Sequence, residues 1–331
     1  MAGSKPSWRR LMKTIVYHKY GSPDVLRMEE VERPTPKENQ VLIKVHAASV
    51  NAGDWREMRA DPFLIRLGGG LLRPKDPRLG SDVAGRVEAV GGNVKQFRPG
   101  DEVFGCAHGA FAEYALAREA YLTLKPANRS FEEAAAMPVA ALTALQGLRD
   151  AGEIQPGQKV LIQGASGGVG TFAVQLAKSF EAEVTAVCSP RNLDMARSIG
   201  ADHVIDYTKE DFTRNRQCYD LIFAANGYHS LSAYKRALCP QGIYVCAGGT
   251  MPQFFEAILL GSWMSRKGGK KMGIMGIAKV IQEDLVYLGE LLEASKIAPV
   301  IDRSYPLSEI AKAIRYVEEI HAQGKVVITV V

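Results

Sequence analysis

The chain has 331 residues, of which 47% are hydrophobic and 23% are charged, and its formal net charge is +5. This length favours two domains, and the composition excludes a disordered or collagen-like protein. The positive charges are scattered rather than gathered in stripes, so we expect no nucleic-acid partner.

The N-terminal segment, residues 1–11, is basic and polar and lacks the apolar stretch of a secretory signal. We expect it to be an extension or tag outside the fold. No run of about 18 apolar residues occurs further along, so the sequence predicts no membrane span.

Short strands separated by Gly and Pro turns characterise the next part of the chain. Alternating, β-branched runs predict strands at residues 13–17, 40–48, 80–90, 102–104 and 111–116. Turn signals such as Arg98-Pro99-Gly100-Asp101 stand between them. The pattern predicts a barrel-like β region.

The pattern changes near residue 131, where Ala- and Leu-rich helices begin and then alternate with strands. We expect helices at 131–136, 140–149, 170–180, 193–199 and 231–238, and strands at 159–163, 183–188, 203–206, 219–224 and 242–247. Such alternation predicts a doubly wound parallel sheet of the Rossmann type.

The pattern is looser after residue 250. We expect an apolar helix at 254–264, followed by the cations Arg266, Lys267, Lys270 and Lys271. We expect this helix to lead to a sheet-edge strand at a homodimer interface rather than to a membrane. Amphipathic patterns predict helices at 279–293 and 308–321, the latter capped by Ser308, and residues 325–331 predict a strand that returns to the β region.

A glycine-rich turn stands between the strand at 159–163 and the helix that follows it. Without β-carbons the backbone can approach a pyrophosphate, and the N–H groups at the helix start face its charge. Because the turn belongs to a strand–turn–helix unit, dinucleotide binding is favoured over a plain turn. The expected contacts are Ala165, Ser166, Gly167, Gly168, Val169 and Gly170.

The end of the next strand indicates which dinucleotide is bound. Ser189-Pro190-Arg191-Asn192 lacks the acidic residue that holds the ribose 2′-OH of NAD. Arg191 offers a guanidinium to a 2′-phosphate, and Ser189 and Asn192 offer hydrogen bonds. Arg191 alone is also compatible with a solvated loop, but the combination predicts NADPH.

Several segments together resemble the zinc-free quinone oxidoreductase (zeta-crystallin-like) branch of the medium-chain dehydrogenase/reductase superfamily. The matching segments are 49–54, 80–85, 97–103, 109–114, 141–144, 164–170, 200–207 and 324–327. The resemblance implies a GroES-like catalytic domain of residues 12–135 and 278–331. It also implies a Rossmann domain of residues 136–277 inserted between them, with the cofactor in the cleft.

The resemblance also assigns residues by position in the sequence. It implies cofactor contacts at Tyr207 near the 2′-phosphate, Ala225 and Asn226 on the adenosine side, Gly248 and Gly249 on the nicotinamide side, and Lys325 in the cleft. Residues 60–78, which include three consecutive glycines, are expected to form a flap over this cleft.

Asn51 and Asp54 match the loop that faces the nicotinamide in the family, so we expect both to be catalytic. Asn51 can donate a hydrogen bond to the cofactor ribose or to a substrate oxygen. A local alternative is that Asn-x-x-Asp caps a helix at residues 55–59. Residues 52–75 contain no tyrosine, which argues against a dedicated acyl-thioester enoyl reductase.

Zinc enzymes of the superfamily place a Cys where this chain has Asn51, and His-Glu where it has Ser81-Asp82. A catalytic zinc needs three protein ligands, so we expect no metal. We expect Cys106, His108 and His46 to be packing residues rather than ligands. The five cysteines, odd in number and without a C-x-x-C pair, favour reduced thiols and a cytoplasmic location.

Without a metal, a quinone or an α,β-unsaturated carbonyl compound accepts hydride more readily than an alcohol is oxidised. The protein then has to position the reactants, exclude water and stabilise the developing oxyanion. The sequence therefore predicts an NADPH-dependent reductase of quinones or enones. The alternatives are an alcohol dehydrogenase and a non-catalytic NADPH-binding regulatory protein.

Overall fold

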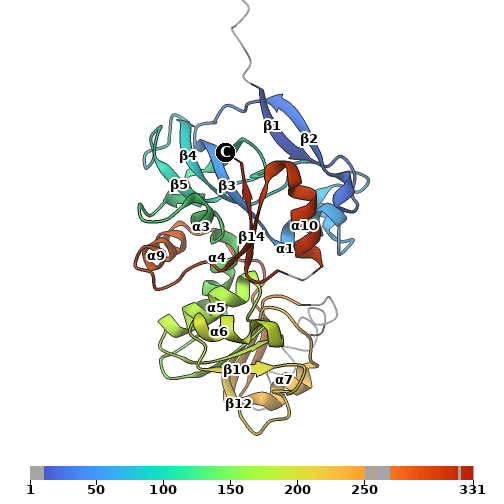
Figure 1. The fold of residues 1–331 in the computed structure, drawn as a ribbon, viewed down its shortest axis with the longest axis vertical. Coiled ribbons are helices and arrows are strands. Elements are labelled where there is room, and N and C mark those ends of the chain that lie inside the picture. Colours follow the sequence, from blue (N-terminus) through green and yellow to red (C-terminus); the bar gives the residue numbers. More distant parts are fainter. Residues whose placement is uncertain (1–10, 250–255, 257–268, 320–321, 331) are drawn as a thin grey trace, which may run out of the picture.

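Two sheets of different construction divide the chain into two lobes, which are stacked along its long axis (Figure 1). The computed structural model describes residues 11–249, 256, 269–319 and 322–330. The expected fold class, a parallel α/β sheet joined to a β-rich region, is confirmed by the strand pairing.

The upper lobe in Figure 1 is β-rich and is built from both ends of the chain. Its seven-stranded sheet has the order β14-β15-β3-β4-β5-β7, with β6 paired to β3, and β1 and β2 form a separate pair. The strands are β1 (Leu11–Val16), β2 (Arg27–Glu32), β3 (Gln40–Val50), β4 (Asp82–Val90), β5 (Glu102–Cys106), β6 (Tyr114–Arg118), β7 (Leu122–Leu124), β14 (Ile301–Pro306) and β15 (Lys325–Thr329). The return of β15 to this lobe, antiparallel to β3, confirms the prediction for the last strand.

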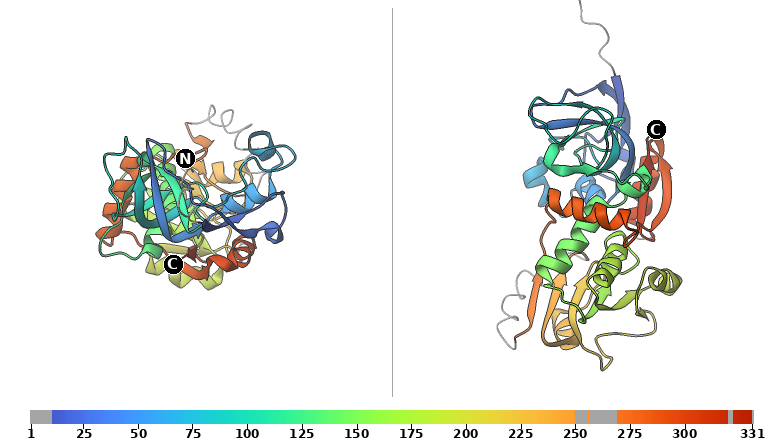
Figure 2. Two further views of the ribbon diagram at one scale, coloured as in Figure 1. Left: turned by 90° about the horizontal axis from the view of Figure 1, so that it is seen from above. Right: turned by 90° about the vertical axis from the view of Figure 1, so that its left-hand side faces the viewer.

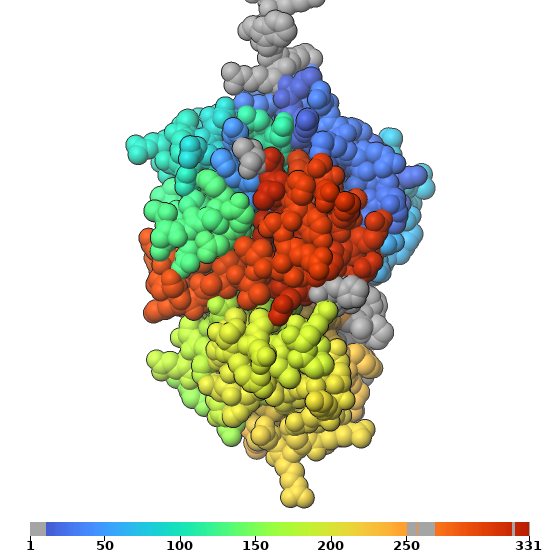
Figure 3. Space-filling model, viewed as in Figure 1, coloured from blue at the N-terminus to red at the C-terminus, as the bar shows by residue number. Residues whose placement is uncertain are grey.

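Short helices surround this sheet. They are α1 (Ala52–Arg59), α2 (Ile65–Gly69), α3 (Phe131–Ala135) and α10 (Ile310–Glu318), with 3-10 turns at Pro23–Val25, Glu119–Tyr121 and Leu307–Glu309. In Figure 3 the C-terminal elements, orange to red, spread over one face of the upper lobe and meet the yellow-green lower lobe at the waist.

The lower lobe contains a six-stranded parallel sheet with the order β10-β9-β8-β11-β12-β13. Its elements are α4 (Pro138–Gln146), the π-helical turn Gly147–Ala151, β8 (Lys159–Gln163), α5 (Gly168–Ser179), β9 (Glu183–Cys188), the 3-10 turn Pro190–Asn192, α6 (Leu193–Ser198), β10 (His203–Asp206), β11 (Tyr219–Ala224), α7 (Leu231–Ala237), β12 (Leu238–Cys246) and β13 (Lys271–Ile274). The strand order reverses between β8 and β11, and in open α/β sheets ligands bind at the carboxyl ends of the strands at such a point.

One buried apolar cluster joins the two lobes. It contains Phe104 of β5 and Val327 of β15 together with Ile162 of β8, Phe172 of α5 and Leu288 of α9 (Gln282–Glu293). Figure 2 shows α9 lying between the lobes. Because the lobes share this core, the upper lobe is held in a fixed position against the carboxyl edge of the parallel sheet.

Several predicted boundaries are wrong. The first strand, expected at 13–17, already includes Leu11, because Leu11 pairs with Glu32 of β2. Ser308 does not cap α10, since residues 307–309 form a 3-10 turn and Glu309 is the N-cap. The helix expected at 279–293 begins only at Gln282. The helix expected at 254–264 lies outside the described residues, except for Glu256.

The prediction of five reduced thiols is also wrong, because Cys218 and Cys239 form a disulfide. Tyr219 of β11 pairs with Leu238 of β12, so the two cysteines beside them reach the same sheet edge with a Cα–Cα distance of 4.9 Å. The other three cysteines are free and buried.

Within the described ranges, no helix combines the length and apolar character needed to cross a bilayer.

Candidate active site

The glycine-rich turn leaves β8 and enters α5, which begins at Gly168, two residues earlier than expected. Gly164 has a φ of +75°, and a β-carbon there would lie 2.7 Å from the backbone nitrogen of Asn226. A β-carbon on Gly170 would lie 2.1 Å from the Gly164 carbonyl oxygen. Glycine is therefore required at Gly170 by the turn itself, and at Gly164 by its positive φ and by the loop after β11.

Gly167, the N-cap of α5, stands beside open space. A β-carbon added there would meet only the carbonyl oxygen of Gly164, at 3.7 Å. The first N–H groups of a helix have no partner inside it and carry its positive dipole end. The turn thus offers both open space and backbone N–H donors, as the pyrophosphate of a dinucleotide requires.

The strand β15 of the upper lobe enters this turn from the other side. Gly324 donates its backbone N–H to the Ser166 carbonyl oxygen at 2.8 Å and forms a bridge with Gly167. A β-carbon on Gly168 would lie 2.9 Å from Cδ of Lys325. Lys325 therefore lies directly against the start of α5.

The Lys325 ammonium is buried, with 3% of the residue exposed. Its Nζ donates to Asn51 Oδ1 at 2.6 Å, to Asp82 Oδ2 at 3.2 Å and to the Val50 carbonyl oxygen at 3.3 Å. An ammonium has three hydrogens, so these contacts occupy all of them. The structure thus brings together Asn51 and Lys325, which lie 274 positions apart in the chain.

Asp82 is the centre of this cluster and is fully buried. Its Oδ2 accepts hydrogen bonds from Ser49 Oγ at 2.6 Å and Asn51 Nδ2 at 2.8 Å, besides the ammonium of Lys325. Its Oδ1 accepts the backbone N–H of Val139 at the start of α4, at 2.9 Å. A buried charge of this kind is tolerated because it is paired and fully hydrogen-bonded.

Asn51 and Asp54 form a capping box at the start of α1, as the local alternative predicted. The Asn51 backbone N–H donates to Asp54 Oδ2 at 2.7 Å. Burial of Asp54 raises its pKa to about 7, and the hydrogen bond from Asn51 opposes this increase. Nδ2 of Asn51 carries two hydrogens and gives one to Asp82, so the other remains for a ligand.

The loops after β11 and β12 stand beside the glycine-rich turn. Ala225 and Asn226 donate their backbone N–H groups to the Gln163 carbonyl oxygen at 3.0 and 3.3 Å. A β-carbon on Gly248 would lie 2.1 Å from the Ala225 carbonyl oxygen. The Gly249 carbonyl oxygen accepts a bond from Arg56 Nη2 of α1 at 3.3 Å, which links this loop to the upper lobe.

A second group of predicted residues gathers where β9 and β10 end. Asp206 pairs with Cys188, so Ser189 and Tyr207 both follow the same pair, and Tyr207 N donates to the Cys188 carbonyl oxygen at 3.4 Å. Tyr207 is 61% exposed, and Arg191 is also exposed. Asn192 is buried and donates from Nδ2 to Ser189 Oγ at 2.9 Å, so its side chain supports the loop from inside.

Sequence reasoning missed Asp82 and Ser49 as members of the site. The available signal was a carboxylate within the otherwise apolar start of β4, where all of the first four residues are buried. The residue types alone do not show that the partner of Asp82 is Lys325, which lies 243 positions away.

The expected packing residues have ordinary partners. His46 stacks on Phe131 with ring centroids 4.2 Å apart, and His108 Nε2 lies 3.0 Å from Asp76 Oδ2. Cys106 is buried, which raises the pKa of its thiol. Across the described part of the chain, no three His, Cys, Asp or Glu side chains are arranged to hold a metal ion.

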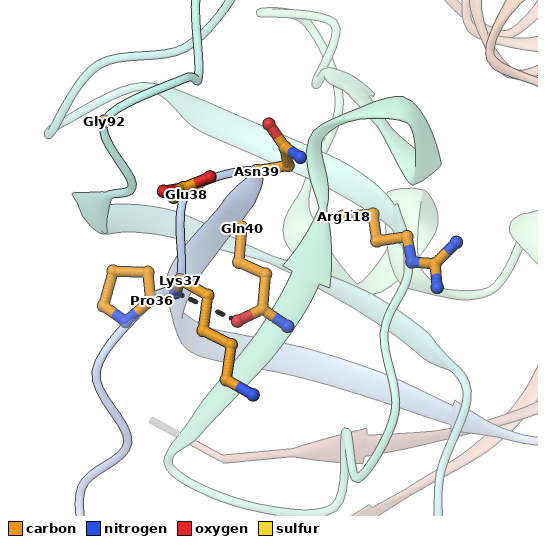
Figure 4. Close-up of a pocket in the computed structure, with 7 residues that line it drawn as sticks. All are labelled: Pro36, Lys37, Glu38, Asn39, Gln40, Gly92 and Arg118. Atoms are coloured by element: carbon orange, nitrogen blue, oxygen red, sulfur yellow. Dashed lines mark hydrogen bonds between the residues drawn. The ribbon is translucent and has the colours of Figure 1, made fainter.

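A surface hollow of about 850 Å³ lies at the opposite end of β3 from Asn51 (Figure 4). It is lined by Pro36, Lys37, Glu38, Asn39, Gln40, Gly92 and Arg118. The eleven residues of β3 span about 35 Å at 3.2–3.4 Å each, so this hollow is separate from the site around Lys325.

Two protein-family descriptions match the chain. An alcohol dehydrogenase GroES-like domain matches residues 37–127, and a zinc-binding dehydrogenase domain matches residues 199–328. The second match does not include positions 51 and 82. The two matches fall on the β-rich lobe and on the parallel sheet with the C-terminal elements.

Curated relatives match almost the whole chain. A 2-methylene-furan-3-one reductase of Solanum lycopersicum is 36% identical over 96% of this chain and 79% of the relative. A chloroplastic quinone-oxidoreductase homolog of Spinacia oleracea is 35% identical over 96% of this chain and 98% of the relative. An NADPH-dependent alkenal/one oxidoreductase of Arabidopsis thaliana is 34% identical over 96% of this chain and 79% of the relative.

The fold also matches solved structures. The quinone oxidoreductase from Coxiella burnetii superposes with a TM-score of 0.86 at 31% identity, covering 97% of this chain and 100% of that one. These matches show that the chain belongs to the quinone oxidoreductase branch of the medium-chain dehydrogenase/reductase superfamily and is an oxidoreductase that uses a nicotinamide cofactor.

Proposed function

We propose that this enzyme reduces quinones or α,β-unsaturated carbonyl compounds with NADPH and without a metal. The observation that carries the proposal is the buried cluster of Lys325, Asp82 and Asn51 against the cofactor turn. It holds the Asn51 side chain in place with one amide hydrogen left, and this donor would stabilise a developing oxyanion.

The cofactor would lie along the carboxyl edge of the parallel sheet. Residues 165–170 would hold the pyrophosphate, Ala225 and Asn226 the adenosine side, and Gly248 and Gly249 the nicotinamide side. When bound, the nicotinamide supplies the hydride. The preference for NADPH rests on Arg191, Ser189 and Tyr207, which stand together where β9 and β10 end.

Asn51 is the proposed catalytic residue. Its free amide hydrogen would donate to the substrate oxygen that gains charge as hydride arrives at the β-carbon or the quinone ring. Lys325 has no hydrogen left for a ligand, so we assign it as a positioning residue that holds Asn51 Oδ1 and places positive charge behind the amide. Asp54, which caps α1 through the Asn51 backbone, is also a positioning residue.

Activated substrates fit this apparatus better than alcohols. A neutral amide donor stabilises an enolate or hydroquinone oxygen, but it does not ionise an alcohol as a zinc ion does. Three relatives are named for the reduction of a methylene-furanone, a quinone and alkenals or alkenones, all of which accept hydride readily.

We propose a metal-free site because of the hydrogen bonds that the same residues already make. Asn51 and Asp82 already bind the Lys325 ammonium, so a cation at this position would have to displace a buried ion pair. Elemental analysis of the pure enzyme tests this directly, and one zinc per chain together with loss of activity in chelator would revive the alcohol dehydrogenase alternative.

The assembly and location are further proposals. Among the described residues, β13 is the last strand of the six-stranded sheet, and we propose that it pairs with β13 of a second copy in a homodimer. We propose residues 12–135 and 278–331 as the catalytic domain, 136–277 as the cofactor domain, and the cytoplasm as the location. Sedimentation, limited proteolysis and imaging of a tagged chain test these three points.

The decisive assay follows NADPH oxidation with a panel of quinones, enones, alkenals and simple ketones. We expect turnover with the first three classes and almost none with ketones. Asn51→Leu should lower kcat about a hundredfold, in the range found for a lost oxyanion donor. Asn93→Ala, which changes an exposed amide near Glu38, is the matched control. Tight NADPH binding without any turnover would favour the regulatory alternative.

A further inference from the structure

The segment from residue 62 to residue 75 exposes an unusual amount of apolar surface. Five large apolar side chains are more than half exposed: Phe63 at 60%, Leu64 at 58%, Leu67 at 69%, Leu71 at 58% and Leu72 at 89%. Isolated exposed apolar residues are ordinary, but a group of this size on one short segment marks an interaction surface.

Cations are interspersed among these side chains, and acids are not. Arg66, Arg73 and Lys75 are the charged residues between Pro62 and Lys75, and the nearest carboxylates are Asp61 and Asp76 at the two ends. Both Arg73 and Lys75 are exposed. The segment therefore has a formal net charge of +3, of which the cations of Arg73 and Lys75 are exposed together with the apolar side chains.

The backbone of the segment is fixed rather than loosely attached. Tyr20 donates its hydroxyl to the Gly70 carbonyl oxygen at 2.7 Å, and Lys75 N donates to the Gly69 carbonyl oxygen at 2.7 Å. The Arg66 guanidinium lies 4.7 Å from the Tyr20 ring centroid. The exposed side chains are thus held outward on a preformed corner, which lies at one edge of the upper lobe in Figure 2.

We propose that residues 62–75 form a peripheral docking face for an anionic lipid bilayer. Leu71 and Leu72 stand at the tip, where they can enter the boundary between headgroups and acyl chains. Arg73 and Lys75 follow them directly and can reach lipid phosphates. Charge complementarity favours this occupant over a second copy of the chain, because two copies of a face with +3 charge repel each other.

Docking through this face places the active site near the bilayer. The segment follows α1, whose first turn is capped by Asn51 and whose eight residues span about 12 Å. A quinone or alkenal with an apolar tail would then reach the site from the lipid surface. This consequence rests on the proposed function, whereas the docking itself does not.

Vesicle flotation of the full chain tests the proposal without any measurement of turnover. The probes are phosphatidylcholine vesicles with and without phosphatidylglycerol, at low and high salt. We expect the chain to float with the anionic vesicles at low salt and to be released at high salt. Leu71→Ser/Leu72→Ser should lower the partition coefficient about tenfold or more.

Two matched controls separate this face from the rest of the surface. Leu124→Ser changes a side chain on β7 that is 57% exposed, close to the 58% of Leu71, and should leave binding unchanged. Arg73→Gln/Lys75→Gln should weaken binding to anionic vesicles by about tenfold. Lys37→Gln/Arg118→Gln removes the same two charge types at the hollow of Figure 4 and should have little effect.

Three outcomes would overturn the proposal. One is absence of flotation with anionic vesicles, and another is equal flotation of the native chain and the Leu71/Leu72 variant. The third is a concentration-dependent increase in mass that this variant abolishes, since that would assign the face to self-association. All variants change exposed side chains, and unaltered thermal unfolding confirms that they fold. If the native chain does not float with anionic vesicles but still reduces quinones, the docking proposal is refuted and the proposed function stands.

Discussion

Asp54 gives the sharpest test of how the buried cluster is built. Its carboxyl is only 3% exposed, and burial raises its pKa from 3.8 to about 7. In Asp54→Asn the side-chain amide oxygen can still accept the Asn51 backbone N–H, so the cap is retained while the charge is removed. The variant therefore isolates the cost of holding a carboxylate in this position.

The sign and size follow from the two pKa values. Between about pH 4 and pH 7 the folded chain keeps a proton that the unfolded chain has released, so stability falls as pH rises. A shift of about three units at 1.36 kcal/mol each makes the full effect on the order of 4 kcal/mol, complete above about pH 7. Below about pH 4 both states are protonated and the cost vanishes.

The assay is urea unfolding of the native chain and of Asp54→Asn at about pH 4, 5, 6, 7 and 8. We expect the variant to gain stability relative to the native chain as pH rises, by about 3–4 kcal/mol at pH 8 compared with pH 4. Asp101→Asn is the matched control, since Asp101 accepts the Arg98 backbone N–H at 2.9 Å in a solvent-exposed turn. A stability difference for Asp54→Asn that stays constant with pH would refute the reasoning.

Three further predictions concern the cofactor turn and its neighbours. Gly170→Ala should lower the free energy of unfolding by about 1–3 kcal/mol and weaken NADPH binding, because the added β-carbon would lie 2.1 Å from a backbone oxygen. The control Gly92→Ala places its β-carbon in open space, so unfolding measured by calorimetry and NADPH binding measured by titration should both stay unchanged. Lys325→Met should lower the free energy of unfolding in urea by about 3–5 kcal/mol, because Asp82 is left charged and unpaired. The double variant Lys325→Met/Asp82→Asn should recover part of this stability, and losses that simply add up in the double variant would contradict a coupled pair. Arg191→Ala should raise the KM for NADPH about tenfold while that for NADH hardly changes, and equal changes in steady-state kinetics would disprove a contact with the 2′-phosphate.

Local patterns predicted the parts of the molecule that local forces determine. The glycine-rich turn could be predicted from the sequence because Gly164 has a left-handed φ of +75° and Gly170 lies against the Gly164 carbonyl oxygen, six positions away. The alternation of strands and helices likewise predicted the parallel sheet. The prediction of Ser308 as a helix N-cap was wrong because Ser308 lies within a 3-10 turn that begins one residue earlier, at Leu307.

The features that could not be predicted depend on pairing between residues far apart in the sequence. The bond between Lys325 and Asp82 joins residues 243 positions apart, and the Cys218–Cys239 disulfide depends on the register of two neighbouring strands. No periodicity in the sequence shows such pairings. The strands β2 and β14 were missed because their exposed, polar residues give no apolar alternation.

We propose above all that this chain transfers hydride from NADPH to the β-carbon of an activated alkene or to a quinone. The most direct measurement incubates the pure enzyme with NADPH that carries deuterium at the transferred position of C4, together with an α,β-unsaturated ketone. We expect a saturated ketone with one deuterium at its β-carbon, formed equally well in the presence of a chelator. An allylic alcohol with deuterium at the carbonyl carbon, or no labelled product at all, would contradict it.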